Sequence, residues 1–192
     1  MAVNKNRKKR EVQFELTDDD YKAFGRYRIL YTDQGHKMVR RQKATLVVIG
    51  LGVAALFTLF KVDRNFTILM YVLSAACVVA GLVFGERMVL RQQDKTIDKS
   101  SSDIERVRPQ KNIIEFGDDG FTTYAGSDVQ NFSYADVQKV DLTEAAVYVW
   151  MSDTMIMPVP LHAFRDMQEM KEFCKWFRKR VDEQKGTASE EA

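Results

Sequence analysis

Two uninterrupted apolar runs dominate the pattern of hydrophobic and polar positions along the chain. They cover residues 44–60 and 66–85, and neither contains a charged side chain. A helix rises about 1.5 Å per residue and the hydrocarbon core of a bilayer is about 30 Å thick, so each run is about long enough to span it. Because only residues 61–65 separate the runs, we expect an antiparallel transmembrane hairpin. The alternative is a buried hairpin in a soluble bundle, but soluble helices alternate apolar with polar residues.

Small residues recur at four-residue spacing within both predicted spans. The pairs are Gly50 and Ala54, Ala76 and Ala80, and Cys77 and Gly81. Small side chains let helix backbones approach closely in lipid, which predicts packing within the hairpin or, alternatively, a contact between copies of the chain. Since neither run contains an ionisable residue, we expect no ion path or substrate site at the midplane.

Before the hairpin, residues 12–16 alternate apolar with polar side chains, which predicts a strand. Thr17 and Asp20 then have the spacing of a capping box, so a helix is expected over residues 18–31. Its aromatic side chains suit either the headgroup region of a membrane or the surface of the C-terminal domain. Gly35 marks the expected break before the first span.

After the hairpin, residues 86–109 are mostly polar and predict a helical extension, a linker around residues 99–103 and an end at Pro109. From residue 111 the pattern has the two-residue period of strands. The expected strands cover residues 112–116, 121–124, 130–133, 137–142, 146–151 and 155–158. Asp136 is expected to cap a short turn. An amphipathic helix then begins at Asp166, with Glu169 in its first turn, and carries an apolar stripe to Val181.

These elements divide the chain into six segments. They are a basic disordered tail (1–10), a strand with an amphipathic juxtamembrane helix (11–43), the hairpin (44–85), an extension and linker (86–109), a cytoplasmic domain (110–181) and a tail (182–192). A domain of about seventy residues has a marginal core. We therefore expect residues 12–16 to join its sheet.

Charge is distributed unevenly along the chain. Residues 1–43 contain twelve Lys or Arg and six Asp or Glu, whereas residues 111–192 contain nine and fifteen. The acidic end disfavours nucleic-acid binding. Basic residues flank the runs on the side of both termini, so the positive-inside rule predicts a multi-pass protein of the cell (inner) membrane with both termini in the cytoplasm. The basic residues nearest the runs are candidate contacts to anionic lipid: Arg40, Arg41, Lys43, Arg87 and Arg91.

The sequence contains little recognisable chemistry. His36 and His162 have no second His or Cys at metal-ligand spacing, so no metal site is predicted. No catalytic motif or Gly-rich phosphate loop is present, and Asp118 and Asp119 fit a turn better than a catalytic dyad, so we expect neither an enzyme nor a cofactor. Aromatic side chains of the C-terminal domain predict a core. A peptide groove at Tyr134, Trp150 and Trp176 is the alternative.

Four motifs resemble the YcxB-like family of bacterial membrane proteins. They are FELTDDDY (14–21), DDGF (118–121), FSYADVQKV (132–140) and MPVPLHAF (157–164), with Tyr134 where the family often has Trp. The resemblance implies a two-span hairpin and a C-terminal domain similar to pleckstrin-homology-like folds. It brings no catalytic or binding residue with it.

We therefore expect a membrane α+β protein, in which a two-helix transmembrane hairpin carries a small pleckstrin-homology-like β-barrel or sandwich closed by a C-terminal helix. Its expected role is a membrane-anchored cytoplasmic interaction or regulatory module, with membrane lipids and either an unidentified protein partner or a second copy as its contacts. The alternative is a membrane-surface module that binds anionic lipid through its basic juxtamembrane segments.

Overall fold

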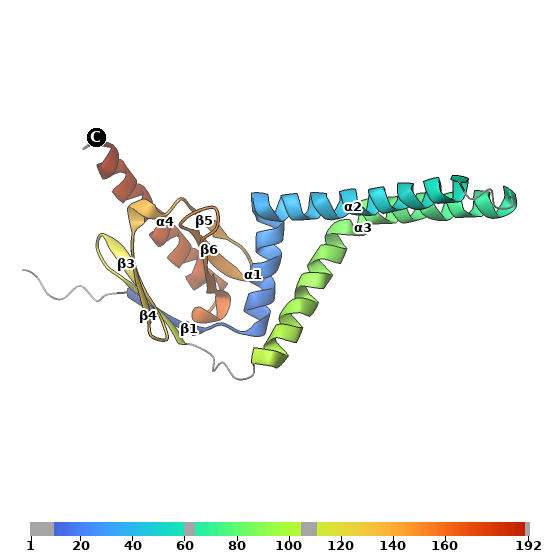
Figure 1. Cartoon of the computed structure of the whole chain (residues 1–192). Helices are drawn as coiled ribbons and strands as arrows, with labels where there is room; N and C mark the ends of the chain where they lie inside the picture. Colours follow the sequence, from blue (N-terminus) through green and yellow to red (C-terminus); the bar gives the residue numbers. More distant parts are fainter. Residues whose placement is uncertain (1–9, 60–63, 105–110, 191–192) are drawn as a thin grey trace, which may run out of the picture. The chain divides into compact units, whose positions relative to one another are not determined.

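The computed structural model describes residues 10–59, 64–104 and 111–190 (Figure 1). It divides into two compact units. Met1–Tyr21 and Ile104–Ala192 form one unit, here the sheet domain, and Lys22–Asp103 form the other, here the helical unit. The expected disordered tail over residues 1–9, most of the connector and the helix end at Pro109 lie outside the described residues.

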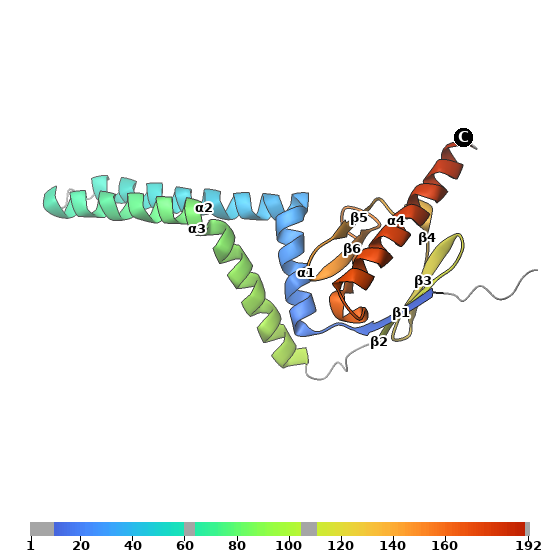
Figure 2. The ribbon, with the colours of Figure 1, turned by 180° about the vertical axis from the view of Figure 1, so that it is seen from behind.

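The helical unit is built from α1 (Asp18–Tyr31), whose first turn belongs to the sheet domain, α2 (Asp33–Leu59) and α3 (Arg64–Ile104). α2 and α3 run side by side as a hairpin, in agreement with the prediction (Figures 1 and 2). Both helices are long and apolar enough to cross a membrane, and only 6% and 11% of their most apolar windows are buried. Their apolar side chains thus face outward, unlike those of a core helix in a soluble protein.

Small residues bring α2 and α3 together, as the sequence predicted for Gly50 and Gly81. The Ser74 hydroxyl donates a hydrogen bond to the carbonyl oxygen of Gly50 at 2.5 Å, and Gly81 is buried against Leu46. Ala76, Cys77 and Ala80 instead lie on the exposed face of α3 and take no part in this packing. Packing within the hairpin is therefore wrong for these three residues, and the alternative, a contact between copies of the chain, stays a prediction.

The corner between α1 and α2 lies at Thr32 rather than at the expected Gly35. The Thr32 hydroxyl donates to the carbonyl oxygen of Arg28 at 2.6 Å and accepts from the N–H of Gly35 at 3.0 Å. A Cβ atom at position 35 would lie 2.4 Å from the carbonyl oxygens of both Arg28 and Ile29. Glycine is therefore required inside α2, where it lets the second helix start against the first.

α1 packs along the last part of α3. Arg26 pairs with Asp94 at 2.6 Å and Lys22 with Asp98 at 2.5 Å, while buried Gly25 lies against Gln93 and Ile97. Packing of α1 against α3 was not predicted from the sequence. α3 changes direction after it leaves α2 and stays helical to Ile104, so the predicted linker around residues 99–103 is wrong (Figure 2).

Two antiparallel sheets form the sheet domain. The first contains β1 (Arg10–Glu15), β2 (Lys111–Phe116), β3 (Gly120–Ala125) and β4 (Asp128–Ser133) in that order. The second contains β5 (Lys139–Leu142), β6 (Ala146–Trp150) and β7 (Ile156–Pro160). The expectation was a barrel or a sandwich. In the described residues the two sheets are separate, so no closed barrel forms, and the domain consists of two antiparallel sheets with a C-terminal helix.

The expected pairing of the N-terminal strand with the C-terminal sheet is confirmed. β1 pairs antiparallel with β2, with Arg10 opposite Phe116 and Glu15 opposite Lys111. Val12 and Phe14 from β1 are 7% and 8% exposed and belong to the core. One strand of this domain therefore comes from before the apolar hairpin and the other strands from after it.

The remaining elements close the core. Short helices η1 (Tyr134–Asp136) and η2 (Leu161–Ala163) follow β4 and β7, and Asp136 caps η1 as predicted by accepting from the N–H of Ser133 at 3.2 Å. α4 (Met167–Glu190) begins beyond Asp166, which accepts from the N–H of Glu169 at 2.8 Å. Because α4 continues to Glu190, the predicted tail over residues 182–192 is wrong for residues 182–190.

Candidate functional site

The three aromatic residues of the predicted groove belong to the core or its cover. Tyr134 is fully buried, its hydroxyl donates to the carbonyl oxygen of Gly117 at 3.1 Å, and burial raises its pKa to about 12. Trp150 is 8% exposed. Trp176 is half-buried beneath Arg10, whose guanidinium lies 4.9 Å from the ring centroid. The core interpretation thus fits these residues, because their aromatic faces are already covered.

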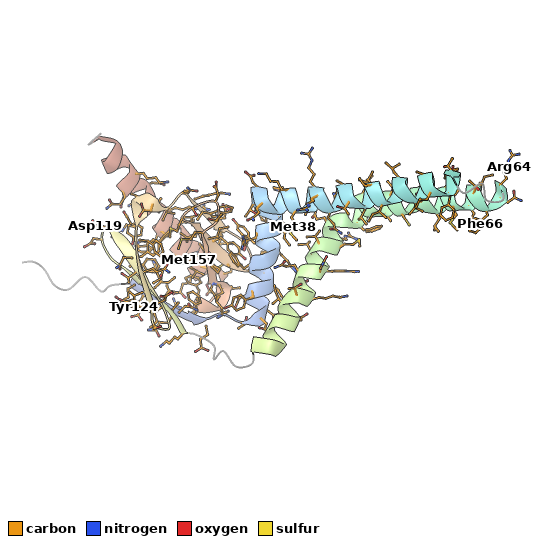
Figure 3. The ribbon with its side chains drawn as sticks, viewed as in Figure 1. Met38, Arg64, Phe66, Asp119, Tyr124 and Met157 are labelled. Carbon is orange, nitrogen blue, oxygen red and sulfur yellow. The ribbon has the colours of Figure 1, made fainter. Side chains whose placement is uncertain are left out.

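A different opening lies between the two sheets of the domain, here called the methionine pocket. It has a volume of about 230 Å³. Its second-sheet wall contains Met151, Met155, Ile156, Met157 and Pro158. Its first-sheet wall contains Phe14, Asn112, Ile114, Thr123, Gln130 and Phe132. Figure 3 labels Tyr124 on β3 and Met157 on β7, one residue from each bounding sheet.

Strand register explains why polar groups also line this pocket. Val12, Ile114, Thr123 and Gln130 lie opposite one another across four strands, and paired positions present their side chains on one face. Thr123 and Gln130 therefore share the inner face with core residues such as Ile114. An apolar pocket with a few polar groups on one wall is the usual composition of a binding site.

Flexible side chains form the rim of the methionine pocket. Met155 is 42% exposed, whereas Met151 and Met157 are half-buried. Methionine is unbranched and polarisable, so it adapts to ligands of different shape. Two exposed acidic residues accompany the pocket: Asp128 lies opposite Ala125 of the first-sheet wall, and Asp153 lies in the turn between Met151 and Met155. The pocket thus offers an adaptable apolar surface in acidic surroundings.

The five basic residues expected near lipid fall into two groups, two that line an opening on the hairpin and three that lie outside it. Arg40 and Lys43 line an opening of about 650 Å³ on the hairpin, together with His36 from α2 and Glu86 from α3. Val39, Ala44, Val47, Val48 and Leu82 complete this opening, here called the cationic notch. Arg41, Arg87 and Arg91 lie outside it on the exposed surfaces of α2 and α3. The Arg87 guanidinium lies 5.9 Å from the centroid of the Phe84 ring.

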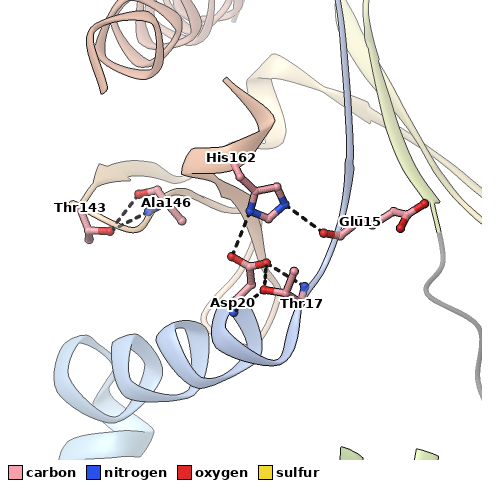
Figure 4. A network of polar contacts seen from close by, with 6 residues as sticks. All are labelled: Glu15, Thr17, Asp20, Thr143, Ala146 and His162. Carbon is pink, nitrogen blue, oxygen red and sulfur yellow. Dashed lines mark hydrogen bonds and ion pairs between the residues drawn. The ribbon is translucent and has the colours of Figure 1, made fainter. Parts of the chain in front are cut away.

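A polar network ties the end of β1 to the segment before α4 (Figure 4). The Nε2–H of His162 donates to the carbonyl oxygen of Glu15 at 3.0 Å, and Nδ1 lies 3.6 Å from the Asp20 carboxylate. Asp20 also accepts from the Thr17 N–H at 2.8 Å and from the Thr17 hydroxyl at 2.6 Å, as the capping box predicted.

This network contains a hydroxyl, a carboxylate and an imidazole but lacks the order of a catalytic triad. In a triad the imidazole receives the proton of the nucleophilic hydroxyl. Here the Thr17 hydroxyl bonds to Asp20, and Nε2 of His162 is occupied by a backbone carbonyl oxygen. The geometry gives these residues a structural role.

Replacing His162 by Ala is expected to destabilise the sheet domain by about 1 kcal/mol, because one partly exposed hydrogen bond across the chain is lost. Chemical denaturation of the full chain in mild detergent, followed by tryptophan fluorescence, measures the change, since Trp150 and Trp176 both lie in this domain. His36→Ala is the matched control and should leave this transition in place. Equal midpoints for His162→Ala and the unaltered chain would contradict the structural role.

No group of three or more His, Cys, Asp or Glu side chains within residues 10–59, 64–104 and 111–190 is arranged to hold a metal ion. Cys174 is buried against the core, and burial raises the pKa of its thiol. Thiolate is the reactive form of cysteine, so this environment suits a packing residue rather than a nucleophile.

The methionine pocket was not predicted, although the sequence contains a pattern that points to it. Met151, Met155 and Met157 lie on either side of one turn, and Pro158 and Pro160 occupy β7. Proline cannot donate to a sheet ladder and is confined to edge strands. Adaptable side chains beside an edge strand were thus visible in the sequence, but their position opposite Thr123 and Gln130 depends on the packing of the two sheets.

No protein-family model, curated protein or solved structure matches this chain.

Proposed function

We propose that the chain is a membrane-anchored interaction module whose hairpin spans the cell membrane and whose sheet domain lies in the cytoplasm with both termini. The pairing of β1 with β2 supports this topology. Residues before and after the hairpin share one sheet, so the chain must return to the side of the membrane that it left. Basic residues flank the hairpin on that same side, as expected for the cytoplasmic face.

The exposed surface of α2 and α3 supports insertion into lipid. Large apolar side chains such as Leu51, Val72 and Val83 are 63%, 63% and 64% exposed. Soluble monomers rarely expose contiguous apolar surface on this scale. The buried Ser74 hydroxyl is bonded to a backbone carbonyl oxygen, which removes the cost of an unsatisfied polar group in hydrocarbon.

We propose further that the sheet domain is of the YcxB-like, pleckstrin-homology-like type. Sheets of four and three antiparallel strands followed by a long C-terminal helix support this proposal. Two of the motifs carry local structure consistent with it. The first contains the Thr17–Asp20 capping box at the start of α1, and another contains the Ser133–Asp136 box of η1.

The partner that we propose is a protein segment with one or two apolar side chains flanked by basic residues. The main support for this partner is the methionine pocket, which is open beside a densely packed aromatic core. Its adaptable Met side chains accept apolar groups, and exposed Asp128 and Asp153 favour positive charge beside them. This role requires no catalytic group in the domain.

Site-specific photo-crosslinking in cells tests the proposal. A benzophenone amino acid at Met155, on the pocket rim, is expected to give a discrete adduct with a partner protein, which mass spectrometry identifies. The same photoreactive group at Glu172, on the exposed surface of α4, is the matched control and should not give that adduct.

A pocket-filling variant links the adduct to the pocket. Ala125 is half-buried on the first-sheet wall, so Ala125→Leu should occupy part of the about 230 Å³ volume and leave stability unchanged or slightly raised. We expect the Met155 adduct to fall at least about tenfold in this background, the equivalent of about 1.4 kcal/mol. An undiminished adduct, or an identical adduct from Glu172, would contradict the proposed site.

A further inference from the structure

We propose that the cationic notch binds one anionic phospholipid of the membrane, with the lipid phosphate at Arg40 and Lys43 and an acyl chain beside Val47 and Leu82. The inference rests on the proposed membrane insertion of the hairpin. It adds a defined lipid site to the anchor, distinct from general attraction of basic residues to the membrane surface.

The order of side chains along α2 matches the order of groups in a phospholipid. His36, Arg40, Lys43 and Val47 follow at spacings of four, three and four residues, which places them on one helix face. Along α2 the three polar side chains come first and the apolar Val47 follows, and together they cover about 16 Å of helix. Leu82 from α3 supplies a second apolar wall.

The charges of the notch are available to a ligand. Over residues 10–59, 64–104 and 111–190, neither Arg40 nor Lys43 makes an ion pair through its side chain, whereas Lys22 and Arg26 of the same unit are paired with Asp98 and Asp94. Glu86 offsets one of the two cations. The net charge that remains suits a phosphodiester with a single negative charge, such as that of phosphatidylglycerol.

The backbone of α3 preorganises one of the two cations. Gly85 is buried, and a Cβ atom at this position would lie 2.9 Å from Cγ of Lys43. The Lys43 stem therefore lies directly on the glycine, which orients its ammonium group before a ligand arrives. A positioned ammonium loses less side-chain entropy on binding than a freely rotating one.

Native mass spectrometry of the full chain, released from vesicles of phosphatidylcholine containing phosphatidylglycerol, tests the inference. We expect one phosphatidylglycerol molecule to remain bound in preference to phosphatidylcholine. Arg40→Gln and Lys43→Gln should each weaken its retention about fivefold. Lys37→Gln on α2 and Lys95→Gln on α3 each remove one positive charge from an exposed position outside the notch, and each should change retention less than about twofold.

Three outcomes would overturn the inference. Equal losses from the notch variants and their controls would indicate diffuse attraction by surface charge. Competition by soluble glycerophosphoglycerol as effective as that by the intact lipid would indicate a phosphate site without acyl-chain binding. No lipid preference in a chain that resists extraction by alkaline carbonate would overturn the lipid site alone, whereas release of the unaltered chain by carbonate would overturn the proposed anchoring as well.

Discussion

Deletion of residues 1–17 is expected to unfold the sheet domain, although most of that domain lies about a hundred residues further along the chain. β1 contributes Val12 and Phe14 to the core and an entire strand to the first sheet. Loss of Phe14 alone, as Phe14→Ala, should cost roughly 3 to 5 kcal/mol. A domain of this size has a total free energy of unfolding of about 5 to 10 kcal/mol. Loss of the whole strand should therefore remove most or all of that stability.

Protease resistance of the domain in native membranes measures this effect. Gln13→Ala is the matched control, because Gln13 lies on the exposed face of the same strand and should change stability by less than about 0.5 kcal/mol. A protease-resistant domain in the deletion variant would contradict the assignment of β1 to its core.

A rescue experiment separates loss of β1 from loss of the membrane anchor. Residues 10–21 joined to residues 104–192 through a flexible linker of about twelve Gly and Ser residues should fold without the hairpin. Residues 104–192 alone should not fold. Dispersed amide signals in the NMR spectrum of the joined protein, and their absence from the shorter one, are the expected results.

Gly35→Ala is expected to produce the second large effect, at the corner between α1 and α2. The three atoms nearest to the added methyl group would all belong to the backbone, including the Cα atom of Ile29 at 2.5 Å. Backbone cannot move aside like the end of a flexible side chain, so the two helices must separate, at a cost of about 3 kcal/mol. Thermal unfolding in mild detergent, followed by circular dichroism, should show a lower midpoint, and the bond around Thr32 should become sensitive to protease.

Gly52→Ala is the matched control for this substitution. Gly52 lies in the same helix, and a Cβ atom there would meet nothing within 4 Å. Alanine favours a helix more than glycine does, so this variant should be as stable as the unaltered chain or slightly more stable. Equal midpoints for Gly35→Ala and Gly52→Ala would show that the corner does not depend on close backbone contact.

Local patterns in the sequence predicted the elements of the fold well. The helix at Asp18–Tyr31 has the bounds expected from its capping box, and every predicted strand of the C-terminal domain is present with small shifts at its ends. Periodicity and capping depend on neighbours in sequence, which is why they could be read there. The marginal core expected for residues 110–181 led to the prediction that residues 12–16 join its sheet, and the pairing of β1 with β2 confirms it.

The predictions were wrong at positions where tertiary packing overrides the local structural preference of the sequence. Arg10 was expected in a disordered tail because it follows a basic cluster, yet it begins β1 and stacks on Trp176 from α4. Residues 99–103 are polar and were expected to form a linker, but helix α3 continues through them. The two sheets and their open pocket also could not be predicted, because the gap between Thr123 and Met157 depends on contacts between distant strands.

Disulfide trapping in native membranes tests the central claim. The claim is that the chain segments before and after an inserted hairpin pair with each other in one domain, on one side of the membrane. Gln13→Cys and Ile113→Cys occupy directly opposed positions on β1 and β2. The native Cys77 and Cys174 are replaced by Ala, and a protease site is placed between residues 104 and 111. After oxidation and cleavage, the two fragments should remain joined until they are reduced, and both should sediment with the membrane.

Gln13→Cys combined with Val129→Cys is the control for this measurement. Val129 lies on the same face of the sheet but three strands from Gln13, or about 14 Å, which is too far for a disulfide. We expect a disulfide bridge for the first pair and none for the second. Fragments that separate in both variants, or a bridge that forms equally in both, would contradict the pairing of β1 with β2 on one side of the membrane.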